Sequence, residues 1–351
     1  MKEFNLADIK LTKYLFFTGK GGVGKTSTAC ATAVALADEG KKVLLISTDP
    51  ASNLQDVFET ELDGKRKPIK GVDNLEVINL DPLEAADNYK ESVVGPFRGK
   101  LPDSVIENME EQLSGSCTVE IAAFNEFSNF ITNSEFNTDY DHIIFDTAPT
   151  GHTLRMLQLP SAWTDFISES THGASCLGQL SGLEAKKETY KKAVENLSDK
   201  SLTTLVLVTR PDKTPLNEVA RASKELSEIG VKNQILVING ILENYDDDLS
   251  ESIFNKQKLA LENMPDMLTE FDTYTIALRS YNITGIDSIR NLLKKDQIHE
   301  QKVEVKGKLF NLDDVVSDLV KNNRKVIFTM GKGGVGKSTI ASSVALKLSK
   351  L

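Results

Sequence analysis

The chain alternates short, continuous apolar runs with longer stretches whose composition favours helices. The runs are rich in Val, Ile, Leu and Phe and lack the apolar–polar alternation of a half-exposed strand. Buried parallel strands have this character, because the helices that connect them cover both faces of the sheet. The pattern predicts an α/β protein with a doubly wound, mostly parallel sheet, whose strands lie at about residues 14–18, 43–46, 75–80, 142–145, 205–208, 235–238 and 273–278.

Two intervals are too long to be simple connections between neighbouring strands. Residues 82–137 and 157–200 are rich in Glu, Lys, Ala and Leu, which favour helices. We expect both intervals to form helical insertions beside the sheet. After a helix near 286–295, the charged and polar stretch 294–305 has little to bury and is interpreted as a linker or lobe boundary.

The opening of the chain is repeated near its end. The run at 326–329 and the glycine-rich segment after it restate residues 14–26, and Gly331 lies 312 residues after Gly19. A period of that length indicates a duplicated domain and not a solenoid. We therefore expect a first lobe at 1–300, a linker at 301–323 and the start of a second lobe at 324–351. The remaining residues suffice for one helix, so we expect the second lobe to continue beyond Leu351.

Charge and cysteine content disfavour several functional classes. The 351 residues include 41 Lys and Arg and 51 Asp and Glu, for a net charge of −10, which disfavours a nucleic-acid-binding surface. No apolar run approaches the roughly 18 residues of a membrane helix, and the first residues lack the apolar core of a secretory signal. We expect a cytoplasmic protein. Cys30, Cys117 and Cys176 form no C-x-x-C pair and are expected to be reduced thiols.

The segment GKGGVGKT at 19–26 matches the phosphate-binding pattern G-x-x-x-x-G-K-[ST], between a predicted strand and a predicted helix. In such a loop, backbone N–H groups surround the phosphates, Lys25 reaches the β- and γ-phosphates, and the Thr26 hydroxyl binds Mg²⁺. The alternative is a glycine-rich turn without a ligand. The candidate ATP-binding residues are Gly19, Lys20, Gly21, Gly22, Val23, Gly24, Lys25, Thr26 and Ser27, and in the repeat Gly331, Lys332, Gly333, Gly334, Val335, Gly336, Lys337, Ser338 and Thr339.

Two aspartates follow predicted strands. Asp49 comes after the run at 43–46, and Asp146 directly follows the run at 142–145. A carboxylate at the carboxyl edge of a parallel sheet faces the nucleotide crevice. Asp49 is then placed to orient the attacking water and to lie near Mg²⁺, and Asp146 to hold Mg²⁺ directly or through water. Taken singly, either aspartate could instead cap a helix.

Together, GKGGVGKT, STDPASN at 47–53 and DTAPTGHTLRMLQLP at 146–160 resemble the arsenical pump-driving ATPases and their relatives that target tail-anchored membrane proteins. The resemblance covers residues 14–351 and implies the deviant Walker A, or SIMIBI, class of P-loop NTPases. In that class a lysine at the position of Lys20 reaches the nucleotide of a facing lobe, in the manner of an arginine finger. The alternative for Lys20 is a solvated loop lysine.

The resemblance also assigns roles to individual residues. STDPASN becomes a first switch whose Asp49 activates water, and Asp49, Lys20 and Lys25 become the candidate catalytic groups. Arg210 and Asn239 resemble residues that contact the adenine, although either could serve only as a strand-end hydrogen-bonding group.

Within the family, one branch transports trivalent arsenic or antimony, and another is a chaperone with a Met-rich groove and a C-x-x-C zinc site. The segments around Cys117 and Cys176 resemble the cysteine segments of the first branch, and His152 matches its signature histidine. Soft thiolates select soft ions such as As(III) and Sb(III). The glycine- and serine-rich surroundings of both cysteines indicate loops. The alternative is two small core residues, as we expect for Cys30. The resemblance implies that a further cysteine of the second lobe completes the site.

The leading interpretation is an ATPase, activated by As(III) or Sb(III), that uses ATP and Mg²⁺ to drive metalloid extrusion. The implied partners are a membrane arsenite pump subunit, which would hold the protein at the inner membrane, and a second ATPase lobe in cis or a second copy in trans. A metallochaperone is a further candidate partner, and nucleic acid is not expected. The alternative is an ATP-switched targeting chaperone for tail-anchored proteins. A partitioning ATPase ranks last, because no terminal basic amphipathic segment is visible.

Overall fold

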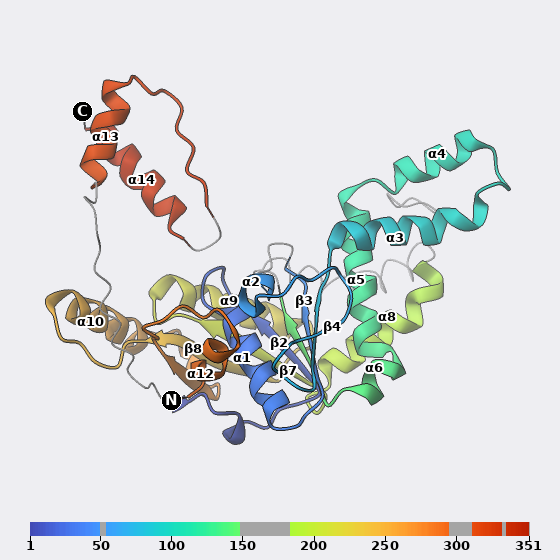
Figure 1. Cartoon of the computed structure of the whole chain (residues 1–351), viewed down its shortest axis with the longest axis horizontal. Helices are drawn as coiled ribbons and strands as arrows, with labels where there is room; N and C mark the ends of the chain where they lie inside the picture. Colours follow the sequence, from blue (N-terminus) through green and yellow to red (C-terminus); the bar gives the residue numbers. More distant parts are fainter. Residues whose placement is uncertain (50–53, 148–182, 295–310, 332–334, 351) are drawn as a thin grey trace. The chain divides into compact units, whose positions relative to one another are not determined.

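One mostly parallel sheet organises the first part of the chain (Figure 1). The computed structural model describes residues 1–49, 54–147, 183–294, 311–331 and 335–350. The chain divides into unit 1, residues 1–296, and unit 2, residues 297–351. Unit 1 holds the sheet, and each unit is described by itself.

Nine strands, counted over the described residues, form the sheet in the order β1-β9-β8-β7-β2-β6-β3-β5-β4. All neighbours are parallel except β4 and β5, which form an antiparallel edge. The seven predicted strands are confirmed, and the sequence pattern missed only the two-residue edge strands. The strands are β1 (Lys2–Glu3), β2 (Tyr14–Thr18), β3 (Val43–Ser47), β4 (Lys67–Pro68), β5 (Leu75–Asn79), β6 (His142–Asp146), β7 (Thr203–Thr209), β8 (Gln234–Ile241) and β9 (Thr273–Ala277).

The strands form because their residues are buried on both faces of the sheet. All five residues of β2 are buried, and successive side chains point to opposite faces. Tyr14 and Phe16 belong to one hydrophobic core, whereas Leu15 and Phe17 belong to the other. This two-sided burial is why the strands read as continuous apolar runs and not as alternating ones.

Helices cover both faces of the sheet (Figure 1). The core on one side includes α1, α2 and α12, and the core on the other includes α3, α5, α8 and α9. The helices of unit 1 are α1 (Lys25–Asp38), α2 (Leu54–Phe58), α3 (Pro82–Val94), α4 (Asp103–Gln112), α5 (Ser116–Thr132), α6 (Ser134–Asp139), α8 (Leu183–Ser198), α9 (Lys213–Glu228), α10 (Asp248–Glu262), α11 (Asp266–Thr269) and α12 (Ile286–Leu292).

The order of the strands fixes where a ligand site lies. From β2 the chain continues to β3 on one side, whereas β7 pairs with β2 on the other. The winding direction therefore reverses at β2. In open α/β sheets, ligands bind outside the carboxyl ends of the strands at such a switch point.

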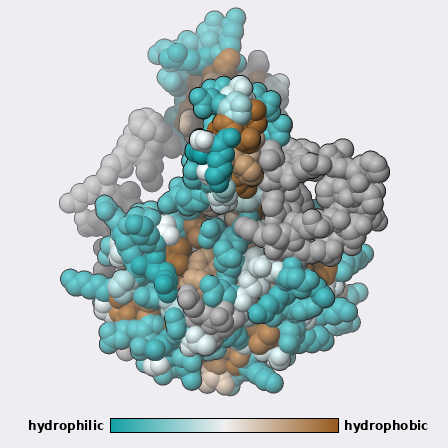
Figure 2. Space-filling view, turned by 90° about the vertical axis from the view of Figure 1, so that its right-hand side faces the viewer, coloured by the Kyte–Doolittle hydropathy of each residue, from teal (hydrophilic) through white to brown (hydrophobic). Residues whose placement is uncertain are grey.

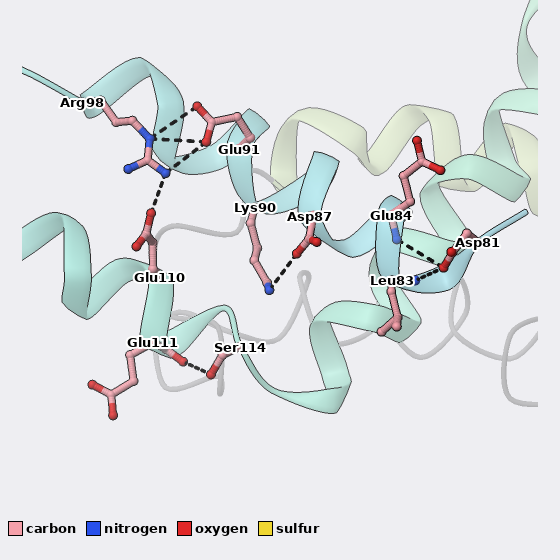
Figure 3. Close-up of polar contacts among 10 residues, drawn as sticks. All are labelled: Asp81, Leu83, Glu84, Asp87, Lys90, Glu91, Arg98, Glu110, Glu111 and Ser114. Atoms are coloured by element: carbon pink, nitrogen blue, oxygen red, sulfur yellow. Dashed lines mark hydrogen bonds and ion pairs between the residues drawn. The ribbon is translucent and has the colours of Figure 1, made fainter. Parts of the chain in front are cut away.

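The first predicted insertion is helical, as expected, and comprises α3 to α6. Arg98 lies between α3 and α4, and its guanidinium bonds to the carboxylates of Glu91 and Glu110 (Figure 3). The Asp81 carboxylate accepts from the N–H groups of Leu83 and Glu84 and caps α3. Figure 2 shows the face that lies on the right-hand side of Figure 1. The coloured part of its surface is mostly hydrophilic, with separate hydrophobic patches. Of the second insertion, the described part is α8.

Unit 2 consists, in its described residues, of α13 (Leu312–Lys321) and α14 (Lys337–Leu348) packed on each other. Helix α13 lies inside the range predicted as a linker, and an Asn311–Asp314 capping box begins it. The run at 326–329, predicted to repeat β2, is not a strand. Phe328 is 82% exposed there, because no neighbouring strand of unit 2 pairs with the run within the described residues. Residues 295–310 lie outside the described residues. They include the first part of the predicted linker and all of the polar stretch 294–305 except Lys294.

Across the described ranges, no helix combines the length and the apolar character needed to cross a membrane.

Candidate active site

The glycine-rich segment Gly19–Thr26, called the first loop below, lies at the switch point of the sheet. It follows the buried end of β2 and leads into α1, which begins at Lys25. A Cβ on Gly19 would lie 2.1 Å from the Val208 carbonyl oxygen, and a Cβ on Gly24 would lie 2.1 Å from Asn239 Nδ2. Both positions need glycine for space, and both have a positive φ, 151° at Gly19 and 93° at Gly24, that other residues rarely adopt. The glycines let the loop backbone approach its neighbours and leave the N terminus of α1 at the site.

The side chain of Asn239 fastens the first loop to β8. Its Nδ2 donates to the Val23 carbonyl oxygen at 2.9 Å. Asn239 therefore makes a hydrogen bond of the kind expected under its alternative role. Its contact with adenine stays a prediction. Its position also places it on a cavity described below.

Thr26 and Asp146, separated by 120 residues in sequence, are in contact. Thr26 Oγ1 donates to Asp146 Oδ2 at 2.8 Å, and Asp146 is fully buried at the end of β6. Parallel pairing of β2 with β6 places Asp146 beside Phe17, two residues before the first loop begins at Gly19. A hydroxyl and a carboxylate are oxygen donors of the kind that Mg²⁺ takes together with phosphate oxygens. The residues present therefore fit a magnesium site.

Lys25 is buried at the start of α1, and its Nζ donates to the Lys20 carbonyl oxygen at 3.3 Å. Burial lowers the pKa of Lys25, and the carboxylates of Asp146, Asp49 and Glu218 act in the opposite direction. Three carboxylates thus favour the charged form of one buried ammonium. A polyphosphate would supply further negative charge to the same group and favour its protonated form.

Asp49 follows β3, which pairs with β6. Its side chain is half-buried, its backbone N–H donates to Ser47 Oγ at 3.3 Å, and the N–H of Thr48 donates to the Asp146 carbonyl oxygen at 3.0 Å. The structure therefore brings Asp49 to the same edge of the sheet as Lys25 and Asp146. The remaining switch residues, 50–53, lie outside the described residues.

Lys20 forms an ion pair that the sequence did not predict. Its Nζ lies 2.9 Å from Glu218 Oε2 on α9, and the two side chains are 41% and 26% exposed. Lys20 is therefore partnered within its own lobe, and its predicted contact with the nucleotide of a facing lobe stays a prediction. No sequence signal connects the two residues, because Glu218 is one of several acidic residues along an amphipathic helix.

A cavity of about 160 Å³ opens beside the first loop. Arg210 and Asn239, predicted to contact adenine, both line it, together with Ser27 at the start of α1. Arg210 Nε is buried and has no hydrogen-bond partner in the part of the chain that the structure describes. Arg279, Tyr281 and Gly240 also line the cavity and were missed, since nothing in their local sequence marks a ligand site.

Of the three predicted metalloid ligands, only Cys117 lies among the described residues, so the structure does not test whether the three lie together. Cys176 and His152 lie outside the described residues, in 148–182. Cys117 was predicted to lie in a loop, and this is wrong: it is the second residue of α5. The glycine and serines around it mark the boundary of the helix, since Gly115 adopts an extended N-cap conformation and the apolar residues that follow pack into the core. Cys30 is fully buried in α1, as predicted, and burial raises its pKa.

The repeated segment at 331–339 is described in part. Gly331 and residues 335–339 are described, whereas Lys332, Gly333 and Gly334 are not. Gly336 precedes α14 as Gly24 precedes α1.

Comparisons with known proteins agree with this geometry. A profile of the family described as anion-transporting ATPase matches residues 12–296 and 324–351. Arsenical pump-driving ATPases of Acidiphilium multivorum and Escherichia coli are each 48% identical to 96% of this chain, which spans 59% of their length. The ATPase get3 of Sclerotinia sclerotiorum is 31% identical over 80% of this chain and 88% of its own length. The chain therefore belongs to the anion-transporting ATPase family.

Proposed function

We propose that this chain binds and hydrolyses MgATP at the first loop and that the hydrolysis drives the extrusion of arsenite or antimonite through a membrane pump. The observation that carries the hydrolytic part is the 2.8 Å contact between Thr26 and Asp146. It joins the end of the phosphate-binding segment to the acidic strand end, two parts that P-loop ATPases combine around magnesium. The metalloid part is supported by the similarity to arsenical pump-driving ATPases.

In this proposal the first loop binds the phosphates through its backbone N–H groups and through Lys25. Thr26 and Asp146 hold Mg²⁺, which when bound neutralises phosphate charge. Asp49 orients the attacking water and accepts its proton. Arg210 and Asn239 contact the adenine from the cavity beside the loop, and the buried, unbonded Arg210 Nε is a donor that such a ligand would satisfy.

The metalloid would bind at Cys117, Cys176 and His152, with soft ligation by the thiolates. The domain assignment is likewise a proposal: a first lobe, a linker and the start of a second lobe that would carry a second phosphate loop. A second lobe in cis, or a second copy in trans, would supply the facing surface that Lys20 reaches.

The hydrolytic role is tested with Asp49→Ala. We expect MgATP binding to persist, because the first loop is unchanged, and turnover to fall by about 10²- to 10⁴-fold, the usual effect of removing a general base. Binding is measured with a fluorescent ATP analogue, and turnover by phosphate release. The control is Asp56→Ala, on the exposed side of the nearby helix α2. Unchanged turnover in Asp49→Ala would remove its assigned role.

The metalloid role is tested by titrating with antimonite the ATPase rate of a protein that carries both lobes, because the proposed site also takes a cysteine from the second lobe. We expect stimulation that persists in Cys30→Ala, whose thiol is fully buried in α1, and disappears in Cys117→Ser. Indifference to antimonite would contradict metalloid activation. If indifference were accompanied by ATP-dependent binding of an apolar helical peptide, the targeting-chaperone alternative would replace it.

A further inference from the structure

The ion pair between Lys20 and Glu218 places a carboxylate beside a phosphate-binding loop. Glu218 lies on α9, whose residues Leu216 and Val219 are buried in the hydrophobic core. The helix is therefore fixed relative to the sheet, and it holds the Glu218 carboxylate 2.9 Å from the Lys20 ammonium.

This carboxylate opposes the binding of a polyanion. Glu218 acts on Lys25 as well as on Lys20, because it is one of the three carboxylates that raise the pKa of Lys25. Like charges brought together repel each other, so an acidic side chain here disfavours phosphate in the first loop unless a cation offsets it. Lys20 provides that cation in the structure.

We propose that Glu218 is a positioning residue that holds Lys20 in a resting conformation, and that Lys20 exchanges this carboxylate for phosphate of a nucleotide on a facing lobe. The proposal rests on the role of Lys20 in the proposed function. The pair is suited to exchange because both side chains are partly exposed, at 41% and 26%. Partly solvated pairs contribute little net stability, whereas a buried pair would resist separation.

Removing the negative charge should release Lys20. In Glu218→Gln the side chain keeps its size and loses its charge, so the resting conformation is weakened by the small amount that an exposed ion pair contributes. We expect kcat without metalloid to rise about two- to fivefold, the range that such a contribution allows, with KM changing less than kcat.

The matched control is Glu225→Gln. Glu225 lies on the same helix, and its carboxylate is 3.8 Å from Arg221 Nε, at the position four residues before it. The same chemical change two turns further along α9 should leave both kcat and KM unchanged. An equal rise in kcat in Glu225→Gln would overturn the proposal, because the effect would then belong to the charge of α9 and not to Lys20.

A Lys20→Met background separates positioning from simple repulsion. If Glu218 acts on kcat through Lys20, adding Glu218→Gln to Lys20→Met leaves the residual turnover unchanged. If Glu218 only repels nucleotide, its removal tightens MgATP binding equally in both backgrounds and leaves kcat unchanged. The latter result, or an unchanged kcat in Glu218→Gln, would overturn the proposal.

A direct readout keeps the proposal independent of turnover. The side-chain ammonium signal of Lys20 in ¹⁵N NMR, assigned by its loss in Lys20→Met, should exchange with water faster in Glu218→Gln than in Glu225→Gln. It should also change when MgATP is added at protein concentrations that favour association. If the Lys20 signal exchanges faster in Glu218→Gln and changes with MgATP but no turnover is detected, the proposed hydrolysis is contradicted and the positioning role of Glu218 is not. An ammonium signal that is indifferent to both Glu218→Gln and MgATP overturns the positioning role.

Discussion

The two glycine-rich loops of this chain have nearly the same sequence and different surroundings. In the first loop Gly19 has φ 151° and Gly24 has φ 93°, and in the repeat Gly331 has φ 154° and Gly336 has φ 87°. Helices begin directly afterwards, at Lys25 and at Lys337. The glycine conformations and the start of the helix are therefore properties of the local sequence.

The strand before each loop behaves differently. β2 is buried between β6 and β7, whereas the corresponding run at 326–329 is exposed and forms no strand. A Cβ on Gly24 would meet Asn239 at 2.1 Å, while a Cβ on Gly336 would meet nothing within 4 Å. The same segment thus needs neighbouring strands before it becomes a site, because a strand gains its hydrogen bonds and its burial only from other strands.

The largest contrast should appear at Phe16 and its counterpart Phe328. Phe16 is buried and stacks on Phe145 with ring centroids 4.5 Å apart. We expect Phe16→Ala to lower the free energy of unfolding of unit 1 by about 3–5 kcal/mol, measured by urea unfolding followed by circular dichroism. Phe328 is exposed, so Phe328→Ala should change the free energy of unfolding by less than about 0.5 kcal/mol. A comparable loss from Phe328→Ala would show that this run is packed after all.

A smaller contrast is expected at the glycines that precede the two helices. Alanine at Gly24 adopts an unfavourable positive φ and also displaces Asn239 from its bond to Val23, so Gly24→Ala should cost about 2–4 kcal/mol. Gly336→Ala meets only the conformational penalty, about 1–2 kcal/mol. The losses are measured by hydrogen exchange of the amides of α1 and α14. Equal losses in the two helices would mean that contact with Asn239 adds nothing.

The smallest contrast concerns the ends of the two helices. In α1, Asp38 accepts two hydrogen bonds of 2.8 Å from Arg290 of α12, whereas the repeat has Lys350 at the matching position. These hydrogen bonds lower the pKa of Asp38. Both side chains are about one-third exposed, so solvent screens the pair, and Asp38→Asn should destabilise unit 1 by about 0.5–1 kcal/mol at neutral pH.

The pH dependence of that last difference has a definite sign. Because the pKa of Asp38 is lower in the folded state, its stabilisation is present above the ordinary aspartate pKa and is lost as pH falls through the lowered value. The gap between the wild-type chain and Asp38→Asn should therefore close in acid, as followed by thermal unfolding at a series of pH values. Lys350→Gln is the control and should leave unit 1 unchanged throughout. A gap independent of pH would mean that the charge of Asp38 does not stabilise the fold.

Several features of the fold and site were visible in the sequence. The strands of the sheet appear as apolar runs because both faces are covered, and the first loop is marked by glycines at fixed spacing. The family was recognised from three short segments, and this is confirmed. The prediction of a loop around Cys117 failed because glycine and serine are common both in loops and at the start of a helix.

Contacts between distant segments were not visible. The ion pair of Lys20 with Glu218 spans nearly two hundred residues, and the cavity beside Arg210 gathers side chains from α1, β8 and the segment after β9. Such contacts depend on strand order and helix direction. Neither is encoded in the pattern of any one segment.

The sequence by itself determined the glycine conformations of the phosphate loop, the helix that follows it and the apolar runs able to form strands. These features depend on backbone preferences and burial over a few neighbouring residues. Only the tertiary structure decided that one of the two loops stands at the edge of a sheet, with Asp146 hydrogen-bonded to Thr26 and Glu218 paired with Lys20. The physical reason is that parallel pairing of β2 with β6 and β7 supplies the carboxylates and the buried surroundings, and the run at 326–329 has no such neighbours within the described residues.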